Sequence, residues 1–259
     1  MRSNHRFWKC AFALCFAVAA LAFARPVHAQ GIDDFGAYGG FENRGRERSP
    51  QEIAFEFRFG QYRPGVDDDL NGTPYLDTFG TFKRWHVGAE FDWQLLRIKK
   101  VLSFGPGVGF SYTRSSADAP LESGEGFSAQ KTALNIFPFH LVGVLRFDML
   151  ADRTPVPIAP YLKLGAGYAL WWSTIGEEVA RFNGEVGRDE SFGWVFAAGA
   201  VVRLDWLDPR DAAAADAAIG LNHSGLFIEW FKSDLSGFGA TDNMQVGTST
   251  WVAGLVLEI

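Results

Sequence analysis

Eight separate stretches of the chain alternate between bulky apolar residues and residues of a second kind. A period of two places the two kinds on opposite faces of a β-strand. The stretches are residues 53–60, 85–95, 102–113, 134–148, 158–172, 192–206, 226–232 and 248–259. Polar segments containing glycine separate most of them, so the pattern predicts eight strands and little helix.

The second face of these stretches distinguishes a soluble sandwich from a membrane barrel. It mixes Gly, Ala and Ser with charged residues, whereas aromatic and aliphatic side chains fill the other face. A wall that is apolar outside and small or charged inside suits a barrel in lipid, and closure removes the unpaired strand edges. We therefore predict an all-β fold, an eight-stranded antiparallel up-and-down transmembrane β-barrel, and disfavour a soluble lipocalin-like barrel.

Two stretches leave open which face points inward. Val142 and Val144 blur the bulky series of residues 134–148, and Pro138 interrupts it, so a bulge is expected there. In residues 226–232, bulky side chains occupy both faces. Aromatic residues near the ends of the stretches fit the interfacial girdles of membrane barrels; they are Trp85, Trp93, Tyr112, Trp172, Trp194 and Trp206.

Long and short connections alternate along the chain, as they do in membrane barrels. The long, polar links are residues 61–84, 114–133, 173–191 and 233–247, and the short ones are 96–101 and 149–157. The link 207–225 is long where a short periplasmic turn is expected. It predicts a short periplasmic helix that begins after Asp208, has Pro209 in its first turn and ends at Gly220. Both chain ends are then expected in the periplasm.

Residues 1–29 have the features of a secretory signal peptide. Basic residues precede an apolar stretch at 11–24, which is shorter than the roughly 20 residues of a membrane helix. Cleavage is expected after Ala29, with Ala24 as a second candidate. Residues 30–52 are expected to form a flexible periplasmic arm, and residues 53–259 the outer-membrane barrel.

Charge and cysteine content exclude two classes of function. Both cysteines, Cys10 and Cys15, lie in the removable segment, so neither disulfides nor thiol catalysis are expected in the mature protein. The formal net charge is -6, and Lys and Arg form no block. A nucleic-acid partner would therefore lack its main electrostatic attraction.

Seven charged residues fall on the face that is predicted to line the lumen. They are Glu56, Arg58, Glu90, Asp92, Lys163, Arg203 and Glu229. An eight-stranded barrel is only wide enough for side chains to fill, and an unpaired buried charge is costly. We therefore predict a salt-bridged structural plug, with an ion-conducting or gated path as the alternative.

Other motifs predict no catalytic, cofactor or metal site. The D-x-D-x-N-G motif that begins at Asp67 resembles the start of a calcium loop, but Thr78 stands where a bidentate Glu is needed. His223 and Ser224 are adjacent, and adjacent side chains of a strand face opposite ways. The alternate glycines Gly105, Gly107 and Gly109 keep strand spacing and do not form a phosphate loop. The solitary His86 and His140 are expected to be structural.

The chain resembles the small outer-membrane β-barrel proteins of myxobacteria and related Gram-negative bacteria. The resemblance covers almost all of the mature sequence and rests on SPQEIAFEFRFGQYRPGVD from Ser49, TPVPIAPYLKLGAGYALWW from Thr154, LNHSGLFIEWFKSDLSGFG from Leu221 and VGTSTWVAGLVLEI from Val246. More loosely, it resembles the OmpA, OmpX and OmpW barrels. It implies an outer-membrane location, outer-membrane lipid as a partner and the barrel assembly machinery during insertion. It carries over no catalytic residue, and Ile259 departs from the usual terminal Phe or Trp.

Two functions remain open at this point. The first is a non-enzymatic barrel with a largely plugged lumen, which acts as a structural or surface-interaction protein through its outer loops. The alternative is a narrow channel for small or apolar solutes, as OmpW-type barrels are thought to be. The surface partner and the solute are left unspecified by the sequence.

Overall fold

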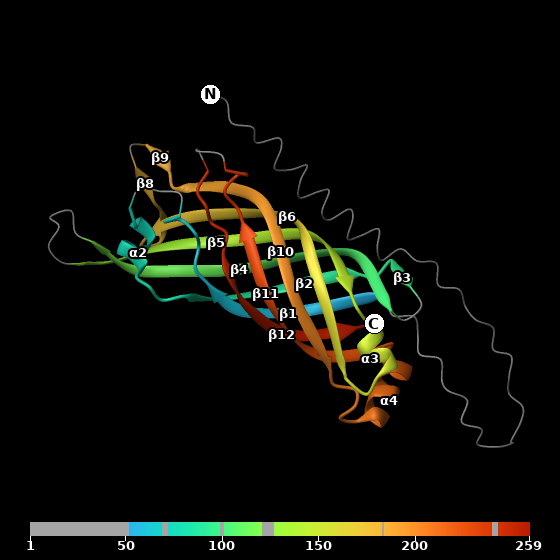
Figure 1. The fold of residues 1–259 in the computed structure, drawn as a ribbon. Coiled ribbons are helices and arrows are strands. Elements are labelled where there is room, and N and C mark those ends of the chain that lie inside the picture. The colour runs from blue at the N-terminus through green and yellow to red at the C-terminus, as the bar shows by residue number, and fades with distance from the viewer. Residues whose placement is uncertain (1–51, 69–71, 99–100, 121–126, 183, 240–242) are drawn as a thin grey trace, which may run out of the picture. The chain divides into compact units, whose positions relative to one another are not determined.

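Eight antiparallel strands close into a barrel in the computed structural model, which describes residues 52–68, 72–98, 101–120, 127–182, 184–239 and 243–259 (Figure 1). The strands are β1 (Ile53–Tyr62), β2 (Arg84–Trp93), β4 (Leu102–Pro120), β5 (Phe127–Arg146), β6 (Ile158–Ile175), β10 (Arg188–Arg203), β11 (His223–Asp234) and β12 (Ser249–Glu258). Each pairs with the next strand along this series, and β12 pairs with β1 to close it. The predicted eight-stranded up-and-down barrel is confirmed.

The strand register fixes how strongly the barrel is sheared. A lateral row that starts at Val202 on β10 returns to the same strand at Phe192, ten residues away. Between these ends the row passes through Leu226, Leu255, Phe57, Ala89, Phe110, Phe139 and Tyr168. A shear of this size tilts the strands by about 40° from the barrel axis. Residues on one lateral row therefore lie at different heights.

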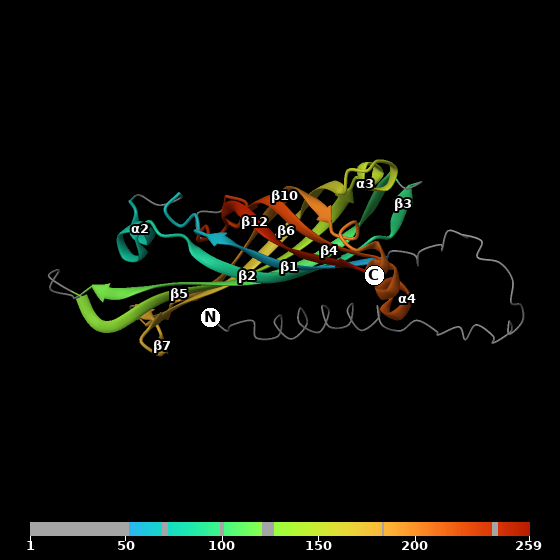
Figure 2. The ribbon, with the colours of Figure 1, turned by 90° about the horizontal axis from the view of Figure 1, so that it is seen from below.

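Shorter elements lie at the two ends of the barrel (Figures 1 and 2). One end, which we call the α2 end, carries α2 (Pro74–Phe79), β7 (Glu178–Val179), β8 (Arg181–Phe182) and β9 (Glu185–Val186). The opposite end, the α4 end, carries β3 (Leu96–Ile98), α3 (Met149–Arg153) and α4 (Pro209–Ile219). None of the helices in the described ranges is long and apolar enough to cross a membrane.

The predicted short helix is confirmed as α4. The Asp208 carboxylate accepts hydrogen bonds from the backbone N–H groups of Arg210 and Asp211, both at 3.1 Å. Gly220 ends the helix in the left-handed region at φ 72°, where a side chain would be strained. The predicted signal peptide and all of the predicted arm except Glu52 lie outside the described residues.

Four strands are longer than the sequence indicates. β4, β5, β6 and β10 continue into residues 114–120, 127–133, 173–175 and 188–191, which alternation assigns to loops. That assignment was wrong because these extensions are mostly polar or small on both faces. The hydrogen-bonded ladder therefore continues after the apolar alternation has ended.

The inward face of β5 and β11 is now defined. On β5, Phe137, Phe139 and Leu141 belong to the outward face. The register between β4 and β5 is the same on both sides of Pro138, so the expected bulge is absent there. The register of this pair shifts instead between Asp118 and Pro120 of β4. On β11 the outward residues are Leu226, Ile228 and Trp230, while Phe227, Glu229 and Phe231 point inward.

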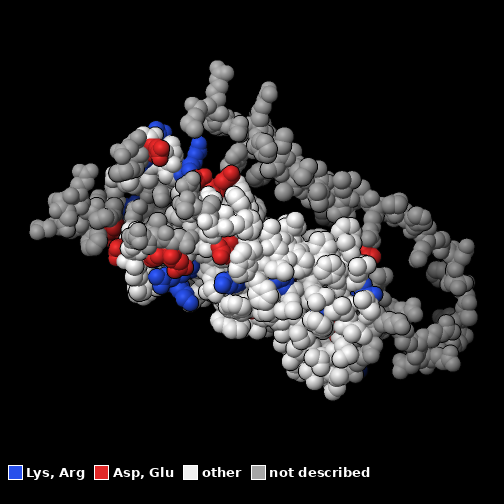
Figure 3. Space-filling view, turned by 45° about the horizontal axis from the view of Figure 1, so that its top comes forward, with Lys and Arg blue, Asp and Glu red and all other residues white. Residues whose placement is uncertain are grey.

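The outer wall of the barrel is apolar through its middle. Phe59 is 50% exposed, Val108 51% and Leu164 63%. Charged side chains gather toward the α2 end and are sparse over the middle of the face that Figure 3 shows. Of the predicted girdle residues, Trp85 and Trp206 are the most exposed, at 71% and 60%. The distribution is the reverse of that in a soluble protein.

Candidate functional site: the filled lumen

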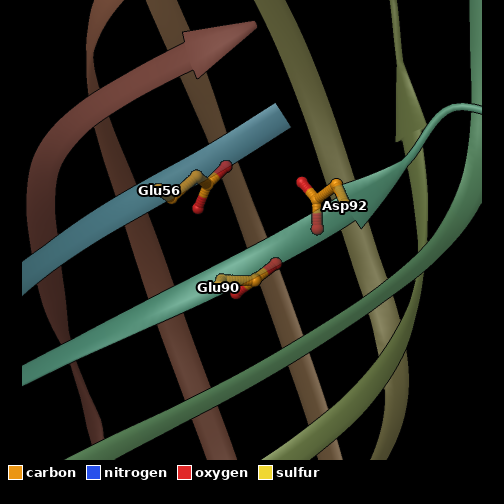
Figure 4. A group of neighbouring side chains, drawn as sticks. All are labelled: Glu56, Glu90 and Asp92. Carbon is orange, nitrogen blue, oxygen red and sulfur yellow. The ribbon is translucent and has the colours of Figure 1, made fainter. Parts of the chain in front are cut away.

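A layer of buried charges crosses the middle of the lumen, and we call it the central layer. Its members come from β1, β2, β6 and β11 and are at most 3% exposed; they are Glu56, Arg58, Glu90, Asp92, Lys163 and Glu229. Figure 4 shows three of the carboxylates on β1 and β2 pointing into the barrel. Six of the seven predicted lumen residues therefore lie together.

Lys163 links one wall of the barrel to the opposite wall. Its Nζ lies 2.8 Å from Glu56 Oε2 and 2.7 Å from Glu90 Oε1. It also lies 4.0 Å from Asp92 Oδ2 and 3.8 Å from Glu229 Oε2. Because Glu56 and Glu90 are directly paired in the register of β1 and β2, their like charges need a cation between them. Lys163 supplies it from β6.

Arg58 is the second cation of the central layer. Its guanidinium donates to Glu56 at 2.9 Å and also donates to Glu90 and Glu229. It lies 5.8 Å and 5.5 Å from the ring centroids of Phe227 and Phe231, within the range of cation–π attraction. Arg58 thus ties β1 to β2 and β11, and the inward aromatics of β11 have a defined role.

The seventh predicted residue, Arg203, lies apart from the central layer. Its Nη2 is 3.1 Å from Asp148 Oδ1, and the Ser103 hydroxyl donates to the same carboxylate at 2.9 Å. A further buried pair joins Arg146 on β5 to Glu258 on β12. Arg146 and Asp148 are absent from the predicted lumen residues because alternation leaves the facing of their stretch open. Alternation on the last stretch could have placed Glu258 inward.

Glycines of β4 make room for the side chains of the central layer. A Cβ on Gly107 would lie 2.3 Å from Asp92 Oδ1, and one on Gly109 would lie 2.3 Å from His140 Nε2. His140 Nε2 is itself 2.7 Å from Glu90 Oε2. The glycine series therefore keeps strand spacing, as predicted, and serves as a spacer for the lumen charges.

Replacing Gly109 with alanine is expected to lower the free energy of unfolding by about 1–3 kcal/mol, because the added methyl group overpacks the site of His140. Urea unfolding in lipid vesicles, followed by tryptophan fluorescence, measures the change. Gly143→Ala is the matched control, since its Cβ would meet the Phe104 ring at an acceptable 3.4 Å. Equal unfolding curves for the two variants would contradict the spacer role.

An apolar cluster lies at the α2 end of the lumen, and we call it the outer cap. Its buried members are Tyr62, Val66, Tyr75, Leu134, Ile136, Ala169, Leu235 and Val246. Two long connections, 63–83 and 235–248, contribute to it. The Tyr62 hydroxyl donates to the Val246 carbonyl at 2.5 Å, and the Tyr75 hydroxyl lies 2.7 Å from Ser115 Oγ. Burial raises the pKa of Tyr75, which keeps its phenol protonated.

A small void lies beside the central layer, and a larger hollow lies at the α2 end. A void of about 10 Å³ adjoins Asp92, Ser103 and Arg146, which is room for about one water molecule. A second apolar cluster packs toward the α4 end and includes Ala54, Ala159, Tyr161, Val201 and Val256. A larger hollow of about 450 Å³ lies at the α2 end, lined by Gln130 and residues 175–181, and opens outward.

The central layer contains a carboxylate arrangement that is able to bind a metal ion. Single oxygens of Glu56, Glu90 and Asp92 all lie within 4.8 Å of one another. Hard cations favour such oxygen ligands. Here the Lys163 ammonium already contacts Glu56 and Glu90, so the protein supplies its own cation, and we assign no metal site.

The calcium-like motif serves a structural purpose at Asp67. Its carboxylate accepts the backbone N–H groups of Tyr75 at 2.8 Å and Leu76 at 3.1 Å, which lie in the first turn of α2. These contacts satisfy backbone groups that a helix start leaves free. Asp69 and Asn71 lie outside the described residues.

The adjacent His223 and Ser224 are separated by the geometry of β11. The buried His223 bonds through Nδ1 to Asp205, and the Ser224 backbone N–H donates to the same carboxylate at 3.2 Å. The two side chains follow opposite faces of the strand. This geometry does not bring the Ser224 hydroxyl to the imidazole, as nucleophilic catalysis would require.

No family model matches the sequence, and none of the curated proteins matches it. Three solved structures are similar in part. Ail of Yersinia pestis, in complex with the heparin analogue sucrose octasulfate, is 12% identical, with 81% of this chain and 97% of that chain covered and a TM-score of 0.43. Neisserial surface protein A is 12% identical, with 80% of this chain and 96% of that chain covered and a TM-score of 0.42. OprG of Pseudomonas aeruginosa is 12% identical, with 81% of this chain and 96% of that chain covered and a TM-score of 0.46. These likenesses carry no argument about activity, and the myxobacterial resemblance stays a prediction.

Proposed function

We propose that the protein is a non-enzymatic β-barrel of the bacterial outer membrane, with a closed lumen and with its external contacts made at the α2 end. The outward lateral row supports a lipid environment. From Val202 to Phe192 it makes a full circuit of apolar and aromatic side chains. Ten residues of strand span about 33 Å, which at a tilt of about 40° rises about 25 Å. That height matches the apolar band of outer-membrane barrels.

The filled lumen is the observation that carries this proposal. The central layer joins opposite walls through Lys163 and Arg58, and the outer cap lies above it. Ions or solutes would have to break several buried ion pairs in order to pass. This arrangement favours the plugged barrel over the narrow channel.

Among the parts of the α2-end connections that the structure describes, the β6–β10 connection is the best suited to external contacts. Residues 175–179 and Arg181 are exposed, and Arg181 and Phe182 of β8 pair with β9 in a small sheet of their own. By contrast, the connections that carry Tyr75, Leu235 and Val246 are held in the outer cap. We therefore assign surface interaction to the β7–β9 region.

The refolded protein is expected to be silent in planar bilayers, because both the central layer and the outer cap close the lumen. Single-channel recording measures this, and a heat-modifiable shift on a gel establishes that the barrel is folded. Steady openings from a folded barrel would contradict the closed lumen and favour the channel function.

A further inference from the structure

A cluster of cations lies on the outer face of the barrel where the apolar wall ends at the α2 end. His86 pairs with Thr113, so their outward neighbours, Trp85 and Arg114, lie side by side on β2 and β4. Lys83 precedes Trp85 by two residues and is exposed, as Arg114 is. The ladder between β1 and β2 ends with the pair Tyr62 and Arg84, and Arg63 and Lys83 are the next residues beyond this pair on the two strands. We call Arg63, Lys83 and Arg114 the basic arc.

The positive charge of the basic arc is incompletely balanced. Within the described ranges, neither Lys83 nor Arg114 forms an ion pair, and Arg63 lies 3.7 Å from Asp67. Asp67 is committed to the first turn of α2, where it accepts two backbone hydrogen bonds. On β4, the next acidic residue is Asp118, which lies directly opposite Lys131 on β5.

The surface below the basic arc is apolar and aromatic. Trp85 is 71% exposed, Val87 53%, Phe110 48% and Tyr112 40%. A cationic rim directly above an apolar wall matches a lipid, whose acyl chains pack against the wall while its headgroup meets the rim. Arginine in particular forms paired hydrogen bonds with phosphate.

The opposite side of the same end differs in its charge. Arg188 at the start of β10 is followed directly by Asp189 and Glu190, and Glu190 accepts a hydrogen bond from the Tyr168 hydroxyl. Lys232 of β11 lies over the Trp194 ring, 5.3 Å from its centroid. The unbalanced positive charge is therefore concentrated over β1, β2 and β4.

We propose that the basic arc binds the phosphate groups of a phosphorylated lipid in the outer leaflet, with Trp85 packed against the same molecule. This inference rests on the proposed outer-membrane location. We assign a lipid to this site because the cations lie along the edge of the apolar wall. A lipid would contact both the cations and the wall, whereas a free phosphate would contact only the cations.

The test compares the refolded protein in phosphatidylcholine vesicles that contain either lipid A or dephosphorylated lipid A. We expect lipid A to raise the unfolding midpoint on a heat-modifiable gel, and dephosphorylated lipid A to leave it unchanged. In the double variant Lys83→Gln/Arg114→Gln, the lipid A concentration that gives half of the rise in the unfolding midpoint should be about 30-fold higher. The reason is that each basic residue at an anionic surface contributes roughly fivefold to the affinity for the lipid. Arg188→Gln, at the same end, should behave like the wild type.

Each other outcome has a defined meaning. Failure to insert into phosphatidylcholine vesicles would overturn the proposed outer-membrane function. Insertion without any response to lipid A would overturn the lipid site alone. An undiminished response in the double variant would overturn its location on the basic arc. An equal response to inorganic phosphate in the buffer would show a site for free phosphate and overturn the lipid as occupant.

Discussion

Replacing Lys163 with methionine is expected to lower the free energy of unfolding by about 3–5 kcal/mol, as the loss of one partner of a buried ion pair does. Lys163 is 2% exposed and lies within 4.0 Å of four carboxylates of the central layer. Without it, Arg58 is the one remaining cation of that layer. Urea unfolding in lipid vesicles measures the loss.

The control for this variant is Lys232→Met. Lys232 is half-buried on the outer wall and contacts the Trp194 ring, so its loss should change the free energy of unfolding by less than about 1 kcal/mol. A similar change in both variants would mean that Lys163 contributes only its packing. The central layer would then not be a cross-barrel link.

A second variant separates charge from packing at the same position. Adding Glu56→Gln to Lys163→Met removes one of the two carboxylates that the ammonium contacts most closely. The double variant should regain at least about 1 kcal/mol of the loss, because interacting residues do not contribute additively. Strict additivity would show that the two side chains are not coupled.

The sequence predicts which charges point inward, but it does not predict which of them meet. Alternation gives the facing of Arg58 and Lys163 because the side-chain period of a strand is two. The height of each side chain along the barrel axis depends on the shear of the barrel. Arg203 shares a lateral row with Glu56 through Gly225 and Val256, yet the slant of that row carries Arg203 to Asp148 at the α4 end.

The burial of the residues of the outer cap could not be predicted from the sequence, for a different reason. Tyr75, Leu235 and Val246 lie in connections that have no alternation to mark an inward face. Their burial follows from the fold of two loops over the mouth of the barrel. The Asp208 cap of α4, by contrast, was predictable, because a helix start has its own local signal.

The central layer and the outer cap are proposed to close the lumen one after the other along the barrel axis, and this arrangement predicts how variants should conduct ions. Replacing four of the six members of the central layer, with Glu56→Ala, Arg58→Ala, Glu90→Ala and Lys163→Ala, deletes two cations and two anions. The net charge of the layer is then unchanged, and Asp92 and Glu229 remain in it. The outer cap still closes the lumen, and we expect a folded quadruple variant to stay silent in planar bilayers. Replacing residues 235–246 with a short turn should leave the barrel silent as well, because the central layer then remains.

Combining the two changes should give steady openings, since either closure alone is sufficient to block the path. Single-channel recording on barrels that pass the heat-modifiable gel test measures this. Openings in the quadruple variant would show that the outer cap does not seal the lumen. Silence in the combined variant would place a further closure at the α4 end, where Tyr161 packs among small apolar residues and Arg146 pairs with Glu258. Conductance therefore locates the closures along the barrel axis, which stability measurements alone do not.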